Sequence, residues 1–303
     1  MRNGEAKKQV SGTCFLCGGK RFRLLFPAGT YRIMTCSQCG MVVTYRKGSG
    51  KTPPSFDFYF DKHYQENYLG SLTQKNLQER AKERLNELEK IANEKTILDV
   101  GCSYGTFLDV AKKEGWDVMG VEPVAPSAEF VLTQGIPVHH GTLADLKTAK
   151  RFDVISYWDV LEHVENPVKE LRLARRFLKP GGILAIQVPN FGSVAAKVGK
   201  ERFGWLCPED HLSHFTHHTI KGVFEEAGYD VVEIRSWPGG KQYFMVLFDY
   251  MFPKKRTLRP VRFLFLKFGV FLDRFFPFLV SLVCWVESRM LMSGLLLVYA
   301  RKK

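Results

Sequence analysis

Two pairs of cysteines near the N-terminus have the spacing of a metal site. Cys14 and Cys17 form one C-x-x-C pair, and Cys36 and Cys39 form a second pair after eighteen intervening residues. Glycine follows each pair, so the backbone can turn tightly and point its amides at the sulfur atoms. Two such turns facing each other hold tetrahedral zinc with no open coordination position. We therefore predict a structural Zn²⁺ site made of these four thiolates.

The role of this zinc segment has two interpretations. About fifty residues are too few to fold around a core of their own, which favours a purely structural metal. The intervening hairpin is basic, which would instead suit docking of nucleic acid or substrate. We favour the structural role, because cations near a doubly anionic zinc–thiolate centre also have a local electrostatic reason to be there. The basic residues of the hairpin are Lys20, Arg21, Arg23 and Arg32.

A second group of reactive side chains lies in residues 208–218, where two acidic residues precede four histidines. Histidine can take a proton near neutral pH, and nearby carboxylates can orient its ring. Three structural alternatives remain open. His211, His214 and His217 suit a metal; Thr216 suits the cap of a helix over about 217–227; and His214 suits a packed loop position with its ring bonded to backbone.

The elements that must position these residues alternate between strand and helix. An amphipathic helix is predicted from Gln74 to Glu94, and helices are predicted over 106–114, 125–134 and 163–178. This alternation predicts an α/β fold with a parallel sheet and ligands at the carboxyl ends of the strands. The predicted strands are Thr96–Val100, Trp116–Val121, Ile136–Val138, Phe152–Ser156 and Ile183–Val188.

Chemistry-bearing residues follow the first two of these strands. Gly101 and Gly105 allow a sharp turn and let a ligand approach the backbone. The G-x-G-x-x-G pattern of dinucleotide folds is absent here, which argues against NAD. Glu122 ends the second strand, where its carboxylate can accept both hydroxyls of a ribose. The pattern therefore favours a nucleoside-containing ligand that is not a dinucleotide.

Four sequence blocks, ILDVGCSYGTF, GVEP, FDVISYWDVLEHVENP and LKPGGIL, resemble the class I S-adenosylmethionine-dependent methyltransferases in order and spacing. The resemblance covers roughly residues 75–236 and the last strand. It implies a Rossmann-like sheet of seven strands with helices on both faces, although Ser103 stands where the family pattern has glycine. The implied cofactor-binding residues are Asp99, Gly101, Cys102, Gly105, Glu122, Thr142, Leu143, Tyr157 and Trp158.

The chemistry of S-adenosylmethionine gives a physical reason for several of these cofactor-binding residues. S-adenosylmethionine has a ribose but no phosphate, so it needs the turn and the acidic residue without a phosphate cradle. Its sulfonium is attracted to aromatic faces such as Tyr157 and Trp158, although both also suit plain core packing. Thr142 and Leu143 stand where the family packs the adenine.

The resemblance also suggests which histidine is the base. The segment around His211 is similar to the corresponding segment of sugar C-methyltransferases, in which a histidine after an acidic pair serves as base, so we predict His211 as the catalytic base. His163 is the second candidate, because a Glu-His pair after the fourth strand is common in small-molecule members. His163 equally suits the start of the next helix.

Charge is distributed unevenly along the chain. The 303 residues carry a formal charge of +13, made of +8 in residues 1–50, −4 in residues 51–240 and +9 in residues 241–303. The longest uncharged run near the C-terminus is Phe275–Val286, which is too short to span a bilayer. Clustered basic residues with aromatic and aliphatic ones predict helices lying on an anionic membrane surface through 241–290. The alternative is that they cover a sheet edge or form a dimer interface.

These observations predict five segments. They are a zinc ribbon (1–50), linker and cap helices (51–94), a methyltransferase core (95–236), an apolar basic insertion (237–293), and a last strand with a basic tail (294–303). The first twenty residues lack a signal-peptide pattern, so we expect a cytoplasmic protein, peripheral at the inner face of the membrane.

The expected reaction is methylation of a hydroxyl or carbon of a small lipid-linked or sugar-containing acceptor. A sugar-nucleotide C-methyltransferase is a close variant. The alternatives are an RNA methyltransferase docking through the ribbon and a non-catalytic cofactor-binding scaffold. Nucleic acid is the less favoured partner, because the Asn/Asp-Pro-Pro-aromatic sequence of base-modifying relatives is replaced by Tyr157-Trp158-Asp159-Val160.

Overall fold

The structure is a computed structural model that describes residues 12–46, 70–237 and 293–303. The chain forms two compact units. The described part of the first unit comprises 12–46, 188–220, 234–237 and 293–297. The described part of the second comprises 70–187, 221–233 and 298–303.

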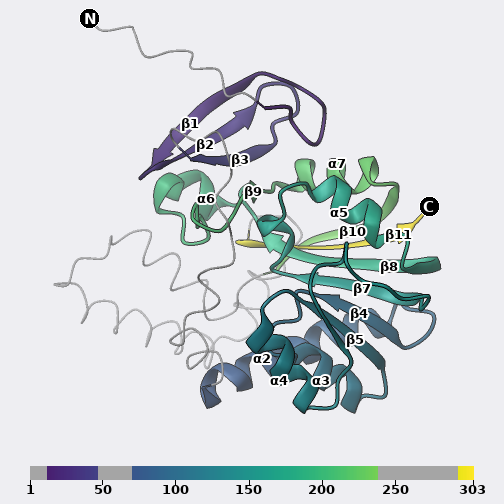
Figure 1. The fold of residues 1–303 in the computed structure, drawn as a ribbon. Coiled ribbons are helices and arrows are strands. Elements are labelled where there is room, and N and C mark those ends of the chain that lie inside the picture. Colours follow the sequence, from purple (N-terminus) through teal and green to yellow (C-terminus); the bar gives the residue numbers. More distant parts are fainter. Residues whose placement is uncertain (1–11, 47–69, 238–292) are drawn as a thin grey trace, which may run out of the picture. The chain divides into compact units, whose positions relative to one another are not determined.

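A seven-stranded sheet carries the expected alternation of strand and helix (Figure 1). Its order is β10-β11-β8-β7-β4-β5-β6, and the pairs β4–β5, β4–β7, β5–β6 and β7–β8 are all parallel. This confirms the prediction of an α/β methyltransferase-like sheet. The strands are β4 (Thr96–Val100), β5 (Asp117–Glu122), β6 (Val138–His140), β7 (Phe152–Trp158), β8 (Leu178–Pro189), β10 (Tyr229–Trp237) and β11 (Leu295–Lys302).

Helices join and cover these strands. Helix α2 (Ser71–Glu89) buries Ala81, Leu85 and Leu88, which the helical spacing places on one face. It packs on α3, and α3 and α4 in turn pack against β5. The other helices of the core are α3 (Thr106–Lys113), α4 (Ala125–Thr133), α5 (Pro167–Ala174) and α7 (His217–Glu226).

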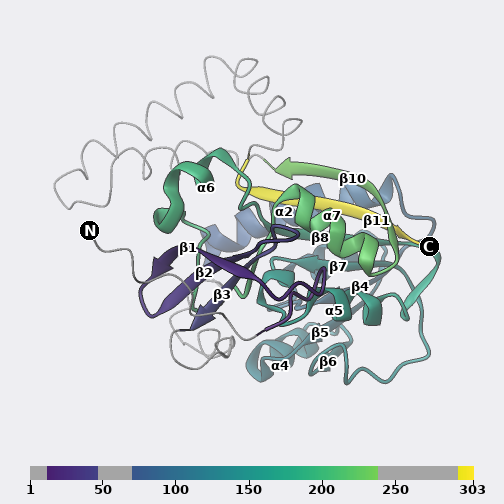
Figure 2. The ribbon, with the colours of Figure 1, turned by 90° about the horizontal axis from the view of Figure 1, so that it is seen from above.

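A smaller, four-stranded sheet belongs to the first unit. Its order is β1-β2-β3-β9, and its three purple strands lie side by side in Figure 2. The strands are β1 (Phe22–Ala28), β2 (Tyr31–Cys36), β3 (Val42–Arg46) and β9 (Ser213–His214), and every pair is antiparallel. The basic hairpin between the cysteine pairs is therefore β1–β2, and a segment about 170 residues later completes the sheet.

One predicted helix begins at a different place. The sequence predicts a helix over 163–178, whereas α5 begins at Pro167 and a short 3-10 turn, η2, covers Leu161–His163. Asn166 explains the difference, because its side chain accepts a hydrogen bond from the amide of Lys169 at 3.0 Å and caps the helix. Proline at the first helical position suits that start. His163 therefore lies before the helix, outside its first turn.

Some predictions fall outside the described residues. The first part of the linker and cap segment predicted over 51–94, up to residue 69, lies outside, and the apolar basic insertion predicted over 237–293 lies almost wholly outside. None of the helices in the described part of the chain combines the length and apolar character that crossing a bilayer requires.

Candidate cofactor site, cysteine cluster and histidine segment

The turn after β4 needs glycine for steric reasons. Gly101 has φ +73°, and a Cβ there would lie 2.6 Å from Cγ2 of Val160. Gly105 also has φ +73° and precedes α3, and its Cβ would lie 2.9 Å from Cγ2 of Val131. Ser103 has φ +49°, a backbone conformation that residues other than glycine rarely adopt. The turn is therefore tight at both ends.

Glu122, at the end of β5, holds this turn. Its carboxylate accepts hydrogen bonds from the amide of Ser103 at 2.7 Å and from the amide of Val124 at 2.9 Å. The side chain is buried, and burial raises its pKa. A carboxylate offers about four acceptor positions, so about two remain for ligand hydroxyls.

Asp99 and Cys102, two further predicted cofactor residues, are both buried in the turn region. Asp99 accepts a hydrogen bond from the hydroxyl of Ser156 at 2.6 Å, and burial raises its pKa to about 7. The Cys102 thiol also has a raised pKa because of burial. Asp99 is therefore only partly ionised near neutral pH and the Cys102 thiol stays protonated, while Glu122 is the acidic group that the turn amides bind.

The residues predicted to contact the sulfonium and the adenine, Tyr157, Thr142 and Leu143, differ in how deeply they are buried. Tyr157 is completely buried and its hydroxyl donates to Glu170 at 3.0 Å, which favours core packing. Leu143 is buried after β6, as an adenine-packing residue would be. Thr142 is more exposed, and its hydroxyl donates to Asp145 at 2.6 Å.

A polar cluster beside Trp158 was not predicted from the sequence. The guanidinium of Arg84, from α2, lies 4.5 Å from the centroid of the Trp158 ring and 3.5 Å from a carboxylate oxygen of Asp159. The amide nitrogen of the Gln187 side chain donates to both oxygens of Asp159 at 2.9 Å. Asp159 has φ +59°, a strained value for a residue other than glycine.

This cluster carries unsatisfied polar groups. Arg84 is buried, and its Nε lacks a hydrogen-bond partner, as does the indole nitrogen of Trp158, within the described residues. Buried polar atoms are nearly always bonded. A polar ligand is therefore one explanation for both atoms. The amphipathic pattern of α2 placed Arg84 on a helix, but nothing in that pattern marked it as buried.

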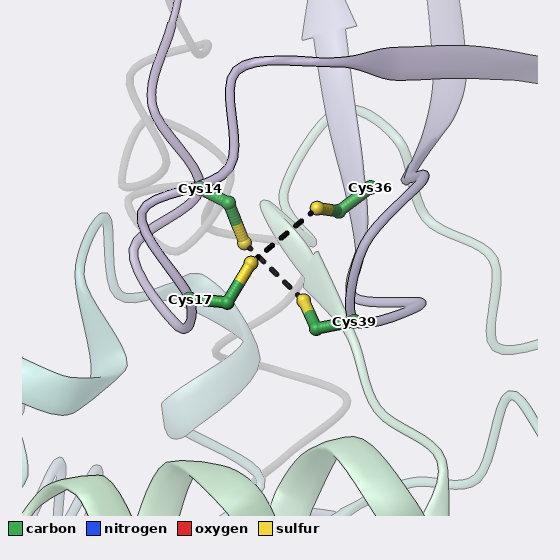
Figure 3. Close-up of side chains that lie close together, drawn as sticks. All are labelled: Cys14, Cys17, Cys36 and Cys39. Carbon is green, nitrogen blue, oxygen red and sulfur yellow. Dashed lines mark hydrogen bonds between the residues drawn. The ribbon is translucent and has the colours of Figure 1, made fainter.

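The four predicted zinc ligands lie together. Figure 3 shows the thiols of Cys14, Cys17, Cys36 and Cys39 pointing toward one another, with Cys14–Cys39 and Cys17–Cys36 sulfur distances of 3.5 and 3.6 Å. All four sulfur atoms lie within 4.8 Å of one another. This spacing is about that of four ligands around one tetrahedral zinc ion.

The backbone around the sulfurs also suits zinc. Gly18 and Gly40 have positive φ, and their amides donate to the carbonyls of Cys14 and Cys36 at 2.9 and 3.0 Å. Burial raises the pKa of Cys36, but hydrogen bonds from the amides of Cys39 and Gln38 more than offset this effect and lower it to about 7. The two C-x-x-C pairs therefore form the facing turns expected from the sequence.

His211 and His214 lie in the first unit, in the segment that includes β9. Nδ1 of His211 lies 2.9 Å from the carbonyl oxygen of Trp205, and it must donate because a carbonyl only accepts. The neutral ring therefore carries its basic lone pair on Nε2. His214 is buried, and its ring bonds the hydroxyl of Thr44 at 2.8 Å. The predicted bond from His214 to backbone is thus replaced by one to a side chain.

The remaining histidine predictions concern helix ends. Thr216 and Thr219 cap α7 reciprocally. The hydroxyl of Thr216 accepts a hydrogen bond from the amide of Thr219 at 3.3 Å, and the hydroxyl of Thr219 accepts one from the amide of Thr216 at 2.9 Å. His217 and His218 stand in the first turn of that helix, with ring centroids 4.0 Å apart. The capping interpretation of Thr216 is confirmed. His163 lies in η2, where its amide donates to the carbonyl of Val160 at 3.0 Å.

Comparison with known proteins agrees with this geometry. A family model described as a methyltransferase domain matches residues 73–234, more than half of the chain. A ubiquinone biosynthesis O-methyltransferase of Pseudomonas paraeruginosa is 30% identical over 154 residues, which are 46% of this chain and 66% of the relative. Its counterpart in Cereibacter sphaeroides is 34% identical over 146 residues, 45% of this chain and 57% of the relative.

A solved structure shows the same fold. The SAM-dependent methyltransferase from Archaeoglobus fulgidus matches with a TM-score of 0.52 and 20% identity, over 81% of this chain and 100% of that one. At this identity the likeness shows the fold alone. The chain spans between about half and two thirds of the length of the curated relatives described above.

Proposed function

The chain belongs to the methyltransferase-domain family, and from this premise we propose that it transfers the methyl group of S-adenosylmethionine to a hydroxyl or carbon of a small acceptor that is lipid-linked or contains a sugar. One observation carries the cofactor part of the proposal. Glu122 is fixed by two amides against a glycine turn that a Cβ would obstruct. Such a site suits a nucleoside without phosphates.

The residues present fit the cofactor. The acceptor positions that remain on Glu122 suit the ribose hydroxyls, and the buried Leu143 suits one face of the adenine. Arg84 is a buried cation with an unsatisfied Nε, and Trp158 offers a ring next to it. A guanidinium of this kind suits the carboxylate of the methionine part.

The chemistry divides between the bound cofactor and the chain. When bound, S-adenosylmethionine supplies an electrophilic methyl group on a sulfonium centre. The chain aligns the acceptor and excludes water, which provides much of the catalysis in a displacement at carbon. For a hydroxyl acceptor we assign His211 as the base that takes the proton at Nε2, with His163 as the second candidate.

Two features support a lipid-linked acceptor. The similar O-methyltransferases are named for ubiquinone biosynthesis, which suggests methylation of an oxygen on a prenylated ring. Residues 241–290 combine clustered basic residues with aromatic and aliphatic ones, a composition suited to an anionic membrane surface. Peripheral attachment at the cytoplasmic face would bring the enzyme to such an acceptor.

Labelled cofactor tests the acceptor class. The purified protein would be incubated with S-adenosylmethionine carrying a radioactive methyl group and with separate lipid, sugar-nucleotide and RNA fractions of a cell extract. Label in the lipid or sugar fraction supports the proposal. Label confined to RNA supports docking of RNA through the zinc ribbon instead, and binding of cofactor without transfer to any fraction supports a non-catalytic scaffold.

Vesicle sedimentation tests the membrane part. The full-length protein and a variant lacking residues 241–290 would be mixed with vesicles of anionic phospholipid and, as control, with vesicles of phosphatidylcholine alone. We expect the full-length protein to sediment with the anionic vesicles only, and the deletion variant to remain in solution. Equal sedimentation of both proteins would rule out docking through this segment.

A further inference from the structure

One residue of the zinc ribbon, Thr44, bonds three points of the histidine segment, residues 208–218. Thr44, on β3, is completely buried and lies five residues after the last cysteine of the cluster. Its amide donates to the carbonyl of Leu212 at 3.0 Å, and its hydroxyl donates to the carbonyl of His211 at 2.8 Å. The same hydroxyl lies 2.8 Å from Nε2 of His214.

The single hydroxyl proton determines the direction of these bonds. Because that proton goes to the carbonyl oxygen of His211, Nε2 of His214 must donate to the hydroxyl oxygen. The chain of bonds therefore runs from the His214 ring through Thr44 to the backbone of His211. His214 is held as the neutral tautomer protonated at Nε2, and burial lowers its pKa to about 3.

Two further contacts fix the same segment. Val42 and Val43 pair with His214 and Ser213 in an antiparallel bridge, which continues the ribbon sheet into the segment. The ring of Phe191 lies 5.3 Å from that of His214. The backbone of His211 is thus held by the ribbon, while its ring is oriented separately by the carbonyl of Trp205.

We propose that Thr44 is a positioning residue for His211. The zinc ribbon then has two roles: it supplies the four cysteine ligands, and it holds the catalytic base in place. The inference rests on the proposed function, because it takes His211 as the base. Thr44 acts through the backbone of His211 and does not touch the reacting atoms. A misplacement of about 1 Å is enough to cost about a hundredfold in rate.

Three variants test the role of Thr44 in the full-length, zinc-loaded protein. Thr44→Val keeps the shape but leaves the His214 donor and the His211 carbonyl without their partner, and we expect kcat to fall at least about tenfold. Thr44→Ser keeps the hydroxyl and should stay within about twofold of wild type. Thr30→Val is the matched control, because it makes the same substitution at an exposed threonine in the turn between β1 and β2. It should also stay within about twofold.

The affinity for S-adenosylhomocysteine distinguishes positioning from general damage. We expect its Kd to be unchanged in Thr44→Val, because the cofactor residues lie in the other compact unit. Wild-type kcat in Thr44→Val would overturn the proposal. A wild-type protein that binds cofactor but methylates no acceptor would instead overturn the proposed function, and the spectra described next would still test the Thr44 contacts.

Long-range nitrogen-15 NMR of the histidine rings needs no variant and no substrate. In the wild-type protein we expect His214 to be neutral and protonated at Nε2, and His211 to carry a proton on Nδ1. In Thr44→Val the His214 signals should shift and the His211 signals should broaden or split. If wild-type His214 is protonated at Nδ1 instead, the bonding that defines the proposal is absent and the proposal fails, even if Thr44→Val does not fold.

Discussion

The carboxylate of Glu122 accepts a hydrogen bond from the backbone amide of Ser103 at 2.7 Å, which ties the end of β5 to the turn after β4. The two residues are nineteen positions apart, and the parallel pairing of β4 with β5 brings them together. This relationship gives one side chain two tasks. Glu122 supports a strained turn and still has acceptor positions for a ribose.

Replacing Glu122 by alanine should therefore weaken cofactor binding strongly. We expect the Kd for S-adenosylhomocysteine to rise at least about tenfold, which corresponds to about 1.4 kcal/mol. Isothermal titration calorimetry measures this directly. Glu129→Ala, an exposed acidic residue on α4, is the matched control and should bind as wild type does. Equal affinities of the two variants would remove Glu122 from the site.

Replacing Gly101 by alanine should affect both the fold and the cofactor. The new Cβ would collide with Val160 and would also have to adopt positive φ. Gly115→Ala is an informative comparison, since Gly115 has φ +82° but open space around it. We expect Gly115→Ala to lower stability by about 1 kcal/mol without changing cofactor affinity. Gly101→Ala should lower both, as followed by thermal unfolding and calorimetry.

Metal analysis should find about one zinc ion per chain. Cys36→Ser removes one of four ligands, so its zinc content should fall well below one, as measured by plasma mass spectrometry. We expect the Kd for S-adenosylhomocysteine to stay within about twofold, because the cofactor residues belong to the other compact unit. A folded wild-type ribbon without metal would contradict the site.

The raised pKa of Asp99 should make the free energy of unfolding depend on pH. Its pKa rises from 3.8 to about 7 on folding, mainly because of burial, so between these values the folded protein holds a proton that the unfolded chain has lost. Asp99 therefore costs stability increasingly as pH rises through this range, and the full cost is reached above pH 7. Asp99→Asn keeps an oxygen for Ser156 and does not titrate.

Thermal unfolding at pH 5 and pH 8, without cofactor, tests this dependence. We expect the Tm of Asp99→Asn relative to that of wild type to be higher at pH 8 than at pH 5. If the difference between the two proteins is the same at both values, Asp99 is ionised in the folded protein at pH 5 and its pKa is not raised.

Local sequence patterns were enough to predict the sheet and the two cysteine turns. The motifs around Gly101 and Glu122 each consist of a few residues that are close in the sequence. The two residues between the cysteines of each C-x-x-C pair are enough to bring both sulfur atoms to one metal. The fold class and the family are accordingly confirmed by the strand order and by the matching family model.

The remaining parts depend on contacts between distant residues. Thr44 and His214 are 170 positions apart, and no periodicity in β3 signals that its threonine bonds a later histidine. Arg84 and Asp159 meet only because α2 and the end of β7 come together in the folded unit. The helix expected from residue 163 begins later because Asn166 caps it, and that signal was present in the sequence as Asn-Pro.

Calorimetric titration of the wild-type protein with S-adenosylhomocysteine is the most direct test of the account, with NAD as a comparison ligand. The glycine turn and Glu122 predict saturable binding of one S-adenosylhomocysteine per chain and no heat of binding with NAD. A folded, zinc-loaded protein that fails to bind S-adenosylhomocysteine, or that binds NAD in its place, would contradict the central claim.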